Sequence, residues 1–165
     1  MRYDEINLKG LYIGLKVCAA DAKILSDYIK GYDLVPVNPL HMTLVKLLRG
    51  KFNFANPPRL NLPITLKASS FYGFARYDFK GIMLGFEGSR VISEWLQNEA
   101  TAYVKGNGMA LGNHDLSAKW KPHISLTYET NKIPEPRRPF PLHNITFDEM
   151  MIEPTKPNWQ KTQGG

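Results

Sequence analysis

Two segments of this chain repeat one alternation of polar and apolar side chains, and that alternation predicts a β-strand in both. They are Leu40-His41-Met42-Thr43-Leu44 and Pro122-His123-Ile124-Ser125-Leu126. Alternate side chains of a strand point to opposite faces, so His41 and Thr43 share one face while Met42 and Leu44 enter the core. The second segment places His123, Ser125 and Thr127 on one face in the same way. Each strand therefore presents an imidazole and a hydroxyl from a rigid element.

Periodicity along the rest of the chain predicts an α+β fold. Strands are expected at residues 8–18, 40–48, 64–74, 81–87, 121–129 and 145–152, and helices at 20–30 and 89–105, with a turn at 77–80. Helices interspersed among mostly antiparallel strands are typical of α+β domains rather than of doubly wound sheets. In each half a helix leads into a strand that begins with a histidine. Residues 1–165 are interpreted as a single domain.

Composition is that of an ordinary globular protein. Hydrophobic residues make up 43% and charged residues 22% of 165 residues, which is enough for one compact core. The single cysteine, Cys18, allows no internal disulfide and fits a reducing cytoplasm. No apolar run has the length of a membrane span, and no signal peptide is recognised. The formal charge of +6 suits a polyanionic ligand, although charge alone can also serve solubility.

The paired motifs suit the cleavage of a phosphodiester. That reaction requires a base to deprotonate the attacking hydroxyl or water and an acid to protonate the leaving oxygen. Histidine titrates near neutral pH, so His41 and His123 can share these two roles. Thr43 and Ser125 can donate hydrogen bonds to phosphate oxygens. No metal and no cofactor are expected, because the carboxylates are scattered along the sequence. The alternative is that both histidines are half-buried strand residues satisfied by their neighbours.

The His-x-Thr and His-x-Ser segments resemble the motifs of the two-histidine phosphoesterase superfamily. The resemblance spans most of the chain, because the order of elements also fits that bilobal fold of two mostly antiparallel sheets, with helices outside and a central cleft. It implies that His41 and His123 are the general acid and base and that Thr43 and Ser125 contact the phosphate. The second hydroxyl belongs to serine where threonine is common in the superfamily, and either residue can donate.

Within that superfamily the chain is most similar to small phage proteins that defeat cyclic-oligonucleotide immunity, the anti-CBASS nucleases. The features that carry this resemblance are the short length, Lys9-Gly10-Leu11-Tyr12 at the start, and Glu153-Pro154 followed by Trp159 at the end. It implies metal-independent cleavage of 3′,5′ bonds in cyclic di- and trinucleotides, in the cytoplasm of a host cell.

Four further residues are candidates for substrate binding. Tyr12 lies beside Gly14 on the polar face of its strand, where a ring can stack on a base. Trp159 lies in a polar tail, and Glu153 can accept a hydrogen bond from a base amino group. Lys121 is expected on the same face as His123, where it can neutralise phosphate. The competing interpretations are surface packing for Tyr12, a tail anchor for Trp159, and solvated side chains for Glu153 and Lys121.

Other basic residues lie near aromatic ones. They are Lys119 beside Trp120, Arg137-Arg138 in a proline-rich loop, and Arg76-Tyr77 close to Phe79. Each group can meet a nucleotide or simply form a solvated surface.

Three other functions stay open from the sequence. The first is an RNA-end processing enzyme that acts on 2′,3′-cyclic phosphates or 2′,5′ linkages. The second is a non-catalytic protein that binds and sequesters nucleotides, and the third is a structural domain. The sequence does not choose between attack by the 2′-hydroxyl and attack by water, and it does not assign the base and acid roles between the two histidines.

Overall fold

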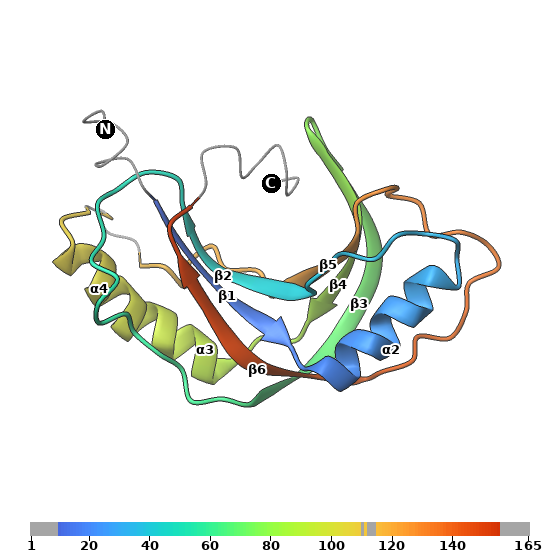
Figure 1. The fold of residues 1–165 in the computed structure, drawn as a ribbon, viewed down its shortest axis with the longest axis horizontal. Coiled ribbons are helices and arrows are strands. Elements are labelled where there is room, and N and C mark those ends of the chain that lie inside the picture. Colours follow the sequence, from blue (N-terminus) through green and yellow to red (C-terminus); the bar gives the residue numbers. More distant parts are fainter. Residues whose placement is uncertain (1–9, 110, 112–114, 156–165) are drawn as a thin grey trace.

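The computed structural model describes residues 10–109, 111 and 115–155. The elements follow one another as β1 (Leu11–Val17), α2 (Ala19–Lys30), β2 (His41–Leu47), β3 (Ile64–Arg76), β4 (Phe79–Phe86), α3 (Arg90–Trp95), the π-helical turn η1 (Leu96–Ala100), α4 (Thr101–Gly106), β5 (His123–Thr127) and β6 (Asn144–Glu153). The strands form a strongly curved sheet, with α2 at one side and α3–α4 at the other (Figure 1). The α+β class is confirmed.

The six strands pair in a closed ring with the order β1-β2-β5-β4-β3-β6. Every pairing among these strands is antiparallel. The two sheets expected from the sequence correspond to two halves of this ring, β6-β1-β2 and β5-β4-β3. The halves are joined by the pair Met42↔Ile124 and by four pairs between β3 and β6. The ring therefore fixes the two histidine strands side by side.

The third and fourth strands are longer than the sequence predicts. Their pairing continues to Arg76↔Phe79, so only Tyr77 and Asp78 form the turn where a turn at 77–80 was expected. Ring contacts explain the extension, because Phe74 packs on Phe79 with ring centroids 5.7 Å apart. Aromatic cross-strand pairs stabilise such a hairpin. The hairpin reaches well beyond the rest of the sheet (Figure 1).

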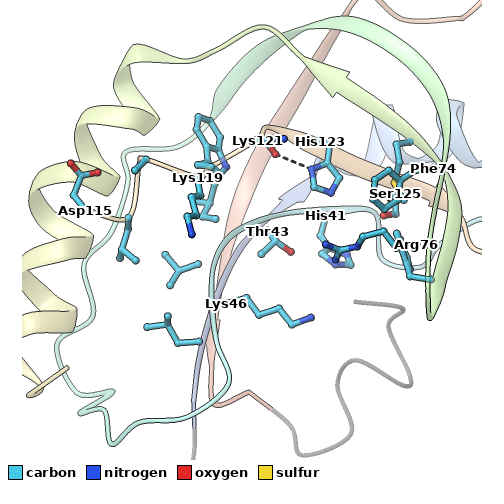
Figure 2. Close-up of a pocket in the computed structure, with 18 of the residues that line it drawn as sticks. His41, Thr43, Lys46, Phe74, Arg76, Asp115, Lys119, Lys121, His123 and Ser125 are labelled. Atoms are coloured by element: carbon cyan, nitrogen blue, oxygen red, sulfur yellow. Dashed lines mark hydrogen bonds between the residues drawn. The ribbon is translucent and has the colours of Figure 1, made fainter. Parts of the chain in front are cut away.

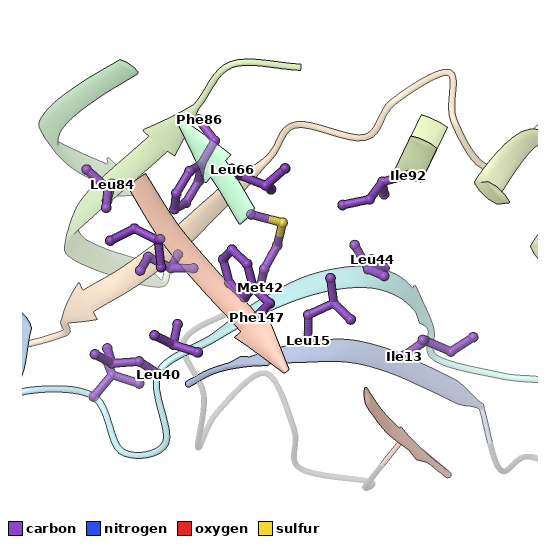
Figure 3. Close-up of a cluster of buried hydrophobic side chains, with 14 of the residues drawn as sticks. Ile13, Leu15, Leu40, Met42, Leu44, Leu66, Leu84, Phe86, Ile92 and Phe147 are labelled. Atoms are coloured by element: carbon purple, nitrogen blue, oxygen red, sulfur yellow. The ribbon is translucent and has the colours of Figure 1, made fainter. Parts of the chain in front are cut away.

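The core lies between the helices and the sheet. Apolar residues of β1, β2, β4 and β6 interdigitate there (Figure 3), and Ile13, Leu15, Met42 and Phe147 are fully buried. Helix α2 contributes Leu25 and Ile29, whose spacing of four residues puts both on one face. Burial of these side chains is the main stabilising term.

The second helical segment, expected as one helix at 89–105, contains a π-helical turn. Ser89 begins it by accepting a hydrogen bond from the backbone N–H of Ile92. At the end of the π-turn the Thr101 hydroxyl donates to the carbonyl of Leu96 at 2.7 Å and accepts from the backbone N–H of Leu116 at 3.1 Å. Thr101 therefore ties the helix to the loop that leads to β5.

A β-bulge occurs at the same place in both histidine strands. In β2, Thr43 pairs with Gly14 and Val45 with Ile13, so Leu44 has no partner. In β5, Leu126 is skipped in the same way, between the pairs Ser125↔Met83 and Thr127↔Ile82. One extra residue shifts the alternation by one position. The residue five positions after each histidine therefore joins the histidine on its face.

This shift corrects one expectation about β5. Thr127 was expected to share the face of His123 and Ser125, with Tyr128 on the opposite face. After the bulge Thr127 enters the core, where it is fully buried, and Tyr128 lines the same cleft as His123. In β2 the corresponding residue is Lys46.

Among the described helices, none combines the length and apolarity needed to cross a membrane.

Candidate active site

A cleft of about 990 Å³ contains both histidines and both hydroxyls of the repeated motifs. Figure 2 shows His41, Thr43, His123 and Ser125 around its centre. The antiparallel pair Met42↔Ile124 sets the arrangement, because it places His41 opposite Ser125 and Thr43 opposite His123. Each imidazole thus faces the hydroxyl of the other motif. The closed ring brings together residues that are far apart in the sequence.

The two imidazoles are held in the same way. Nδ1 of His41 lies 2.7 Å from the carbonyl oxygen of Pro39, and Nδ1 of His123 lies 2.8 Å from the carbonyl oxygen of Lys121. A carbonyl oxygen only accepts, so Nδ1 carries the proton in both rings. Nε2 is then the nitrogen left for chemistry. It can accept a proton when the ring is neutral and donate one when the ring is charged.

The Thr43 hydroxyl has a tyrosine partner. Oη of Tyr12 lies 3.3 Å from Oγ1 of Thr43, and the Tyr12 ring meets the His41 ring edge to face, with centroids 6.3 Å apart. Burial raises the pKa of Tyr12 to about 12, although its hydrogen bond with Thr43 lowers it. The phenol therefore keeps its proton at neutral pH. It can donate to Thr43 and leave the threonine proton for a phosphate oxygen.

Gly14 makes room for this contact. A Cβ atom at position 14 would lie 2.6 Å from the Tyr12 hydroxyl oxygen and 3.0 Å from its ring. The ring therefore lies across the backbone at Gly14. Tyr12 itself is fully buried, so the face that was expected to stack on a base is covered in this structure. Its position is that of a support for Thr43.

The Ser125 hydroxyl has a matching environment. It lies 3.1 Å from the Met83 sulfur, to which it donates. Burial raises the pKa of Tyr128, while a hydrogen bond with Ser125 lowers it. Sulfur is a weak acceptor, so the serine proton is available to a stronger acceptor.

Basic side chains line the cleft around these groups. Lys121 and Lys119 come from the loop before β5, Lys46 from β2 and Arg76 from the β3–β4 hairpin (Figure 2). Burial lowers the pKa of Lys46, the charge of Arg76 lowers it further, and the charge of Asp78 opposes both effects. Asp115 also lines the cleft, but the four basic side chains outnumber it, so the lining carries a net positive charge.

Comparisons with known proteins give a distant structural likeness. No family model matches the sequence, and no curated protein matches it. Among solved structures, a match is found to Usb1 from Kluyveromyces marxianus, with a TM-score of 0.41 and 14% sequence identity. The match covers 74% of this chain and 70% of that chain.

The other predicted binding residues have different positions. Lys121 lines the cleft as expected. Glu153 lies on β6 in register with Tyr12, and its charge contributes to the raised pKa of Tyr12, but it is not among the described residues that line the cleft. Trp159 lies outside the described residues. The roles proposed for Lys121, Glu153 and Trp159 stay predictions.

Arg138 lies away from the cleft and packs against α2. Its guanidinium carbon is 5.5 Å from the centre of the Tyr28 ring and 5.6 Å from that of Tyr32. Its backbone N–H donates to the Tyr32 hydroxyl at 2.7 Å. Its surroundings are therefore those of a structural residue that docks the proline-rich loop.

Lys46 and Tyr128 were missed by sequence reasoning. Strict alternation assigns both to the face opposite the histidines, and only the bulges at Leu44 and Leu126 bring them into the cleft. Nothing in the local alternation marks these bulges, because a bulge depends on the pairing with a partner strand.

Among the residues that the structure describes, no three side chains of the His, Cys, Asp or Glu type lie close enough together to hold a metal ion.

Proposed function

We propose that this chain is a phosphodiesterase that needs no metal ion and uses His41 and His123 as its acid–base pair. One observation carries the proposal. Both imidazoles are fixed through Nδ1 by a carbonyl two residues earlier, and each lies opposite the hydroxyl of the other motif. A structural histidine does not need a fixed Nδ1 and a hydroxyl opposite its ring. Two groups that transfer protons to and from one phosphodiester must be held in a fixed orientation.

The reaction follows from these positions. A phosphodiester bound between the two strands has its attacking oxygen near one Nε2 and its leaving oxygen near the other. When the ribose 2′-hydroxyl attacks, the O2′–P bond forms and the P–O5′ bond breaks. The neutral imidazole takes the proton from O2′, and the protonated imidazole gives a proton to O5′. A water molecule can replace the 2′-hydroxyl: its oxygen then bonds to phosphorus as one imidazole takes its proton, the P–O5′ bond breaks, and the other imidazole protonates O5′. The product then ends in an open 3′-phosphate instead of a 2′,3′-cyclic phosphate.

The motif hydroxyls and Lys121 stabilise the negative charge that develops on the phosphate oxygens during the reaction. Thr43 and Ser125 donate to the two non-bridging oxygens, with Tyr12 holding Thr43 in place. Lys121 adds a positive charge beside His123. Donors that are already in position cost no reorganisation during the reaction, which makes such contacts effective.

The substrates we propose are cyclic di- and trinucleotides, cleaved at 3′,5′ bonds. The volume of about 990 Å³ suits a ligand of that size. The aromatic side chains of Tyr72, Phe74 and Phe79 line the wall formed by the β3–β4 hairpin and offer surfaces for bases. Together with the resemblance noted in the sequence, this supports a phage protein that destroys the messengers of CBASS immunity in the host cytoplasm.

A second candidate is processing of RNA ends, by opening 2′,3′-cyclic phosphates or acting on 2′,5′ linkages. The extent of the cleft supports this candidate, because the residues that line the cleft run from the β3–β4 hairpin past the histidines to Lys119. A linear chain can follow such a path.

Turnover of a cyclic dinucleotide in the presence of EDTA tests the proposal. Wild type is compared with His41→Ala and His123→Ala, and with His143→Ala as a matched control, since His143 is exposed and outside the cleft. Chromatography separates the intact cyclic dinucleotide from its linear products, and linear products with an open phosphate end from those with a 2′,3′-cyclic phosphate. We expect similar turnover by wild type and the control, and turnover at least about a hundredfold slower by the two cleft variants.

A 2′,3′-cyclic-phosphate RNA oligomer is run in parallel. Activity on the oligomer alone assigns the protein to RNA-end processing. Tight binding without any turnover identifies a nucleotide-sequestering protein and contradicts the enzymatic proposal.

A further inference from the structure

Lys46 and Arg76 approach each other from opposite walls of the cleft. Lys46 extends from β2, and Arg76 extends from the β3–β4 hairpin (Figure 2). The bulge at Leu44 turns the Lys46 side chain toward the cleft. Lys46 then pairs with Tyr12 and lies on the face of β2 that carries His41 and Thr43. Arg76 is held from below, with its guanidinium carbon 5.7 Å from the centre of the Phe74 ring.

Among the residues that the structure describes, neither cation forms an ion pair with an acidic side chain. Asp78 is the acidic residue whose charge acts on Lys46, and it lies exposed in the hairpin turn. Lys46 is partly buried, and its pKa is lowered by that burial and by the charge of Arg76. Lys46 is partly desolvated, and Arg76, which is exposed, brings a like charge near it. Both effects disfavour the charged form of Lys46, and an anion between the two cations relieves both.

The site lies close to the catalytic groups. Lys46 is the next residue on the cleft face of β2 after Thr43, because the bulge takes one residue out of the alternation. Two residues of a strand span about 7 Å, so the Lys46 backbone lies about that far from Thr43. A phosphate held at Lys46 is therefore a neighbour of the phosphate being cleaved, within one nucleotide chain.

We propose that Lys46 and Arg76 form a binding site for a second phosphate, adjacent to the scissile one. This inference rests on the proposed phosphodiesterase function and deepens it. The preferred substrates then carry at least two phosphodiesters, as cyclic dinucleotides and short oligonucleotides do. A substrate with one phosphodiester leaves the second site empty.

A series of adenosine substrates separates the two sites, because the bases stay the same while the number of phosphates changes. ApA has one phosphodiester, and ApApA and cyclic di-AMP have two. The variants are Lys46→Gln, Arg76→Gln and the double variant. Lys80→Gln is the matched control, since Lys80 is an exposed lysine of the same hairpin outside the cleft.

We expect each single variant to lower kcat/KM about tenfold on ApApA and cyclic di-AMP, mainly through KM. The loss on ApA should be at least fivefold smaller. The double variant should lose less than the product of the single losses, because both residues hold one phosphate. Lys46→Arg should restore most of the activity, and Lys80→Gln should match wild type. The dependence of kcat/KM on salt concentration should become weaker when either charge is removed.

Binding provides a second readout that is independent of turnover. In a His123→Ala background, ApApA should bind about tenfold more weakly when Lys46 is also changed to Gln, as measured by calorimetry. Equal losses on ApA and ApApA, or no loss on either, overturn the second phosphate site while leaving the phosphodiesterase intact. Failure of wild type to cleave any member of the series overturns the proposed function instead.

Discussion

His41 lies opposite Ser125 across the strand pair β2–β5, as the register Met42↔Ile124 requires. Thr43 lies opposite His123 for the same reason. The two motifs are therefore interleaved: each end of the site combines an imidazole from one strand with a hydroxyl from the other. A phosphodiester in this place meets an acid–base group and a donor on both sides.

The two histidines should behave as one unit. On the substrate that wild type cleaves, His41→Ala and His123→Ala should each lower kcat about a hundredfold to ten-thousandfold. The kcat of the double variant should be close to that of the less active single variant, because removal of either proton-transfer group disables the same step. Steady-state kinetics at several pH values measures this, and wild type should show a bell-shaped profile. Independent, multiplying losses contradict a shared step.

Removal of the motif hydroxyls should slow the chemical step more than it weakens binding. Thr43→Val and Ser125→Ala should each lower kcat about a hundredfold, with a smaller change in KM, because a donor to developing charge acts mainly in the transition state. Thr65→Val is a suitable control, since the Thr65 hydroxyl contacts Thr146 on the exposed surface. A rise in KM with unchanged kcat shows that the hydroxyls serve only ground-state binding.

Tyr12 should act on the reaction through Thr43. Tyr12→Phe keeps the ring but removes the hydroxyl that lies 3.3 Å from Thr43, so kcat should fall about tenfold while folding is preserved. Gly14→Ala should produce a similar loss by a different route, because the new Cβ displaces the same hydroxyl. In a Thr43→Val background, Tyr12→Phe should have little further effect on kcat. Full additivity of the two changes contradicts this positioning role.

The fold could be predicted from the sequence where the signal is periodic. The alternation in β1, β2 and β5 and the apolar stripe of α2 identify these elements, and the expected helix at 20–30 agrees with α2 at Ala19–Lys30. The two matched motifs also select the four residues that the structure brings into one cleft, while their catalytic roles stay a prediction. The positions of Lys46 and Tyr128 in the cleft could not be predicted, because a bulge depends on pairing with a partner strand and leaves no mark on local alternation. The burial of Tyr12 depends on the neighbouring strand in the same way.

The raised pKa of Tyr12 predicts a pH dependence of stability. A tyrosine with a pKa of about 10 in the unfolded chain and about 12 in the folded one stabilises the fold fully below pH 10. That stability is lost as the pH rises through about 12, because the unfolded chain releases the proton earlier. The advantage of wild type over Tyr12→Phe should therefore shrink by about 2 to 3 kcal/mol across this window.

Urea unfolding of wild type and Tyr12→Phe at pH 8, 10 and 11 measures this difference, of which about half, ~1.4 kcal/mol, is expected by pH 11. Tyr28, whose pKa is also raised by burial, is present in both proteins, so its effect cancels. A constant difference in unfolding free energy between pH 8 and pH 11 contradicts the burial of Tyr12 in solution.

Arg138 should contribute to stability without contributing to catalysis. Its guanidinium lies over Tyr28 and Tyr32, with space provided by the missing side chain of Gly31. Arg138→Ala should lower the free energy of unfolding by about 1 to 2 kcal/mol, through lost cation–π contact and packing, and leave kcat unchanged. Arg137→Ala is the matched control, because the Arg137 side chain is exposed and its Nε lies 4.0 Å from Oε1 of Glu135. Its effect on stability should stay within about 0.5 kcal/mol. Equal stability of the two variants contradicts the docking role, and a fall in kcat for Arg138→Ala alone assigns this loop a part in the reaction.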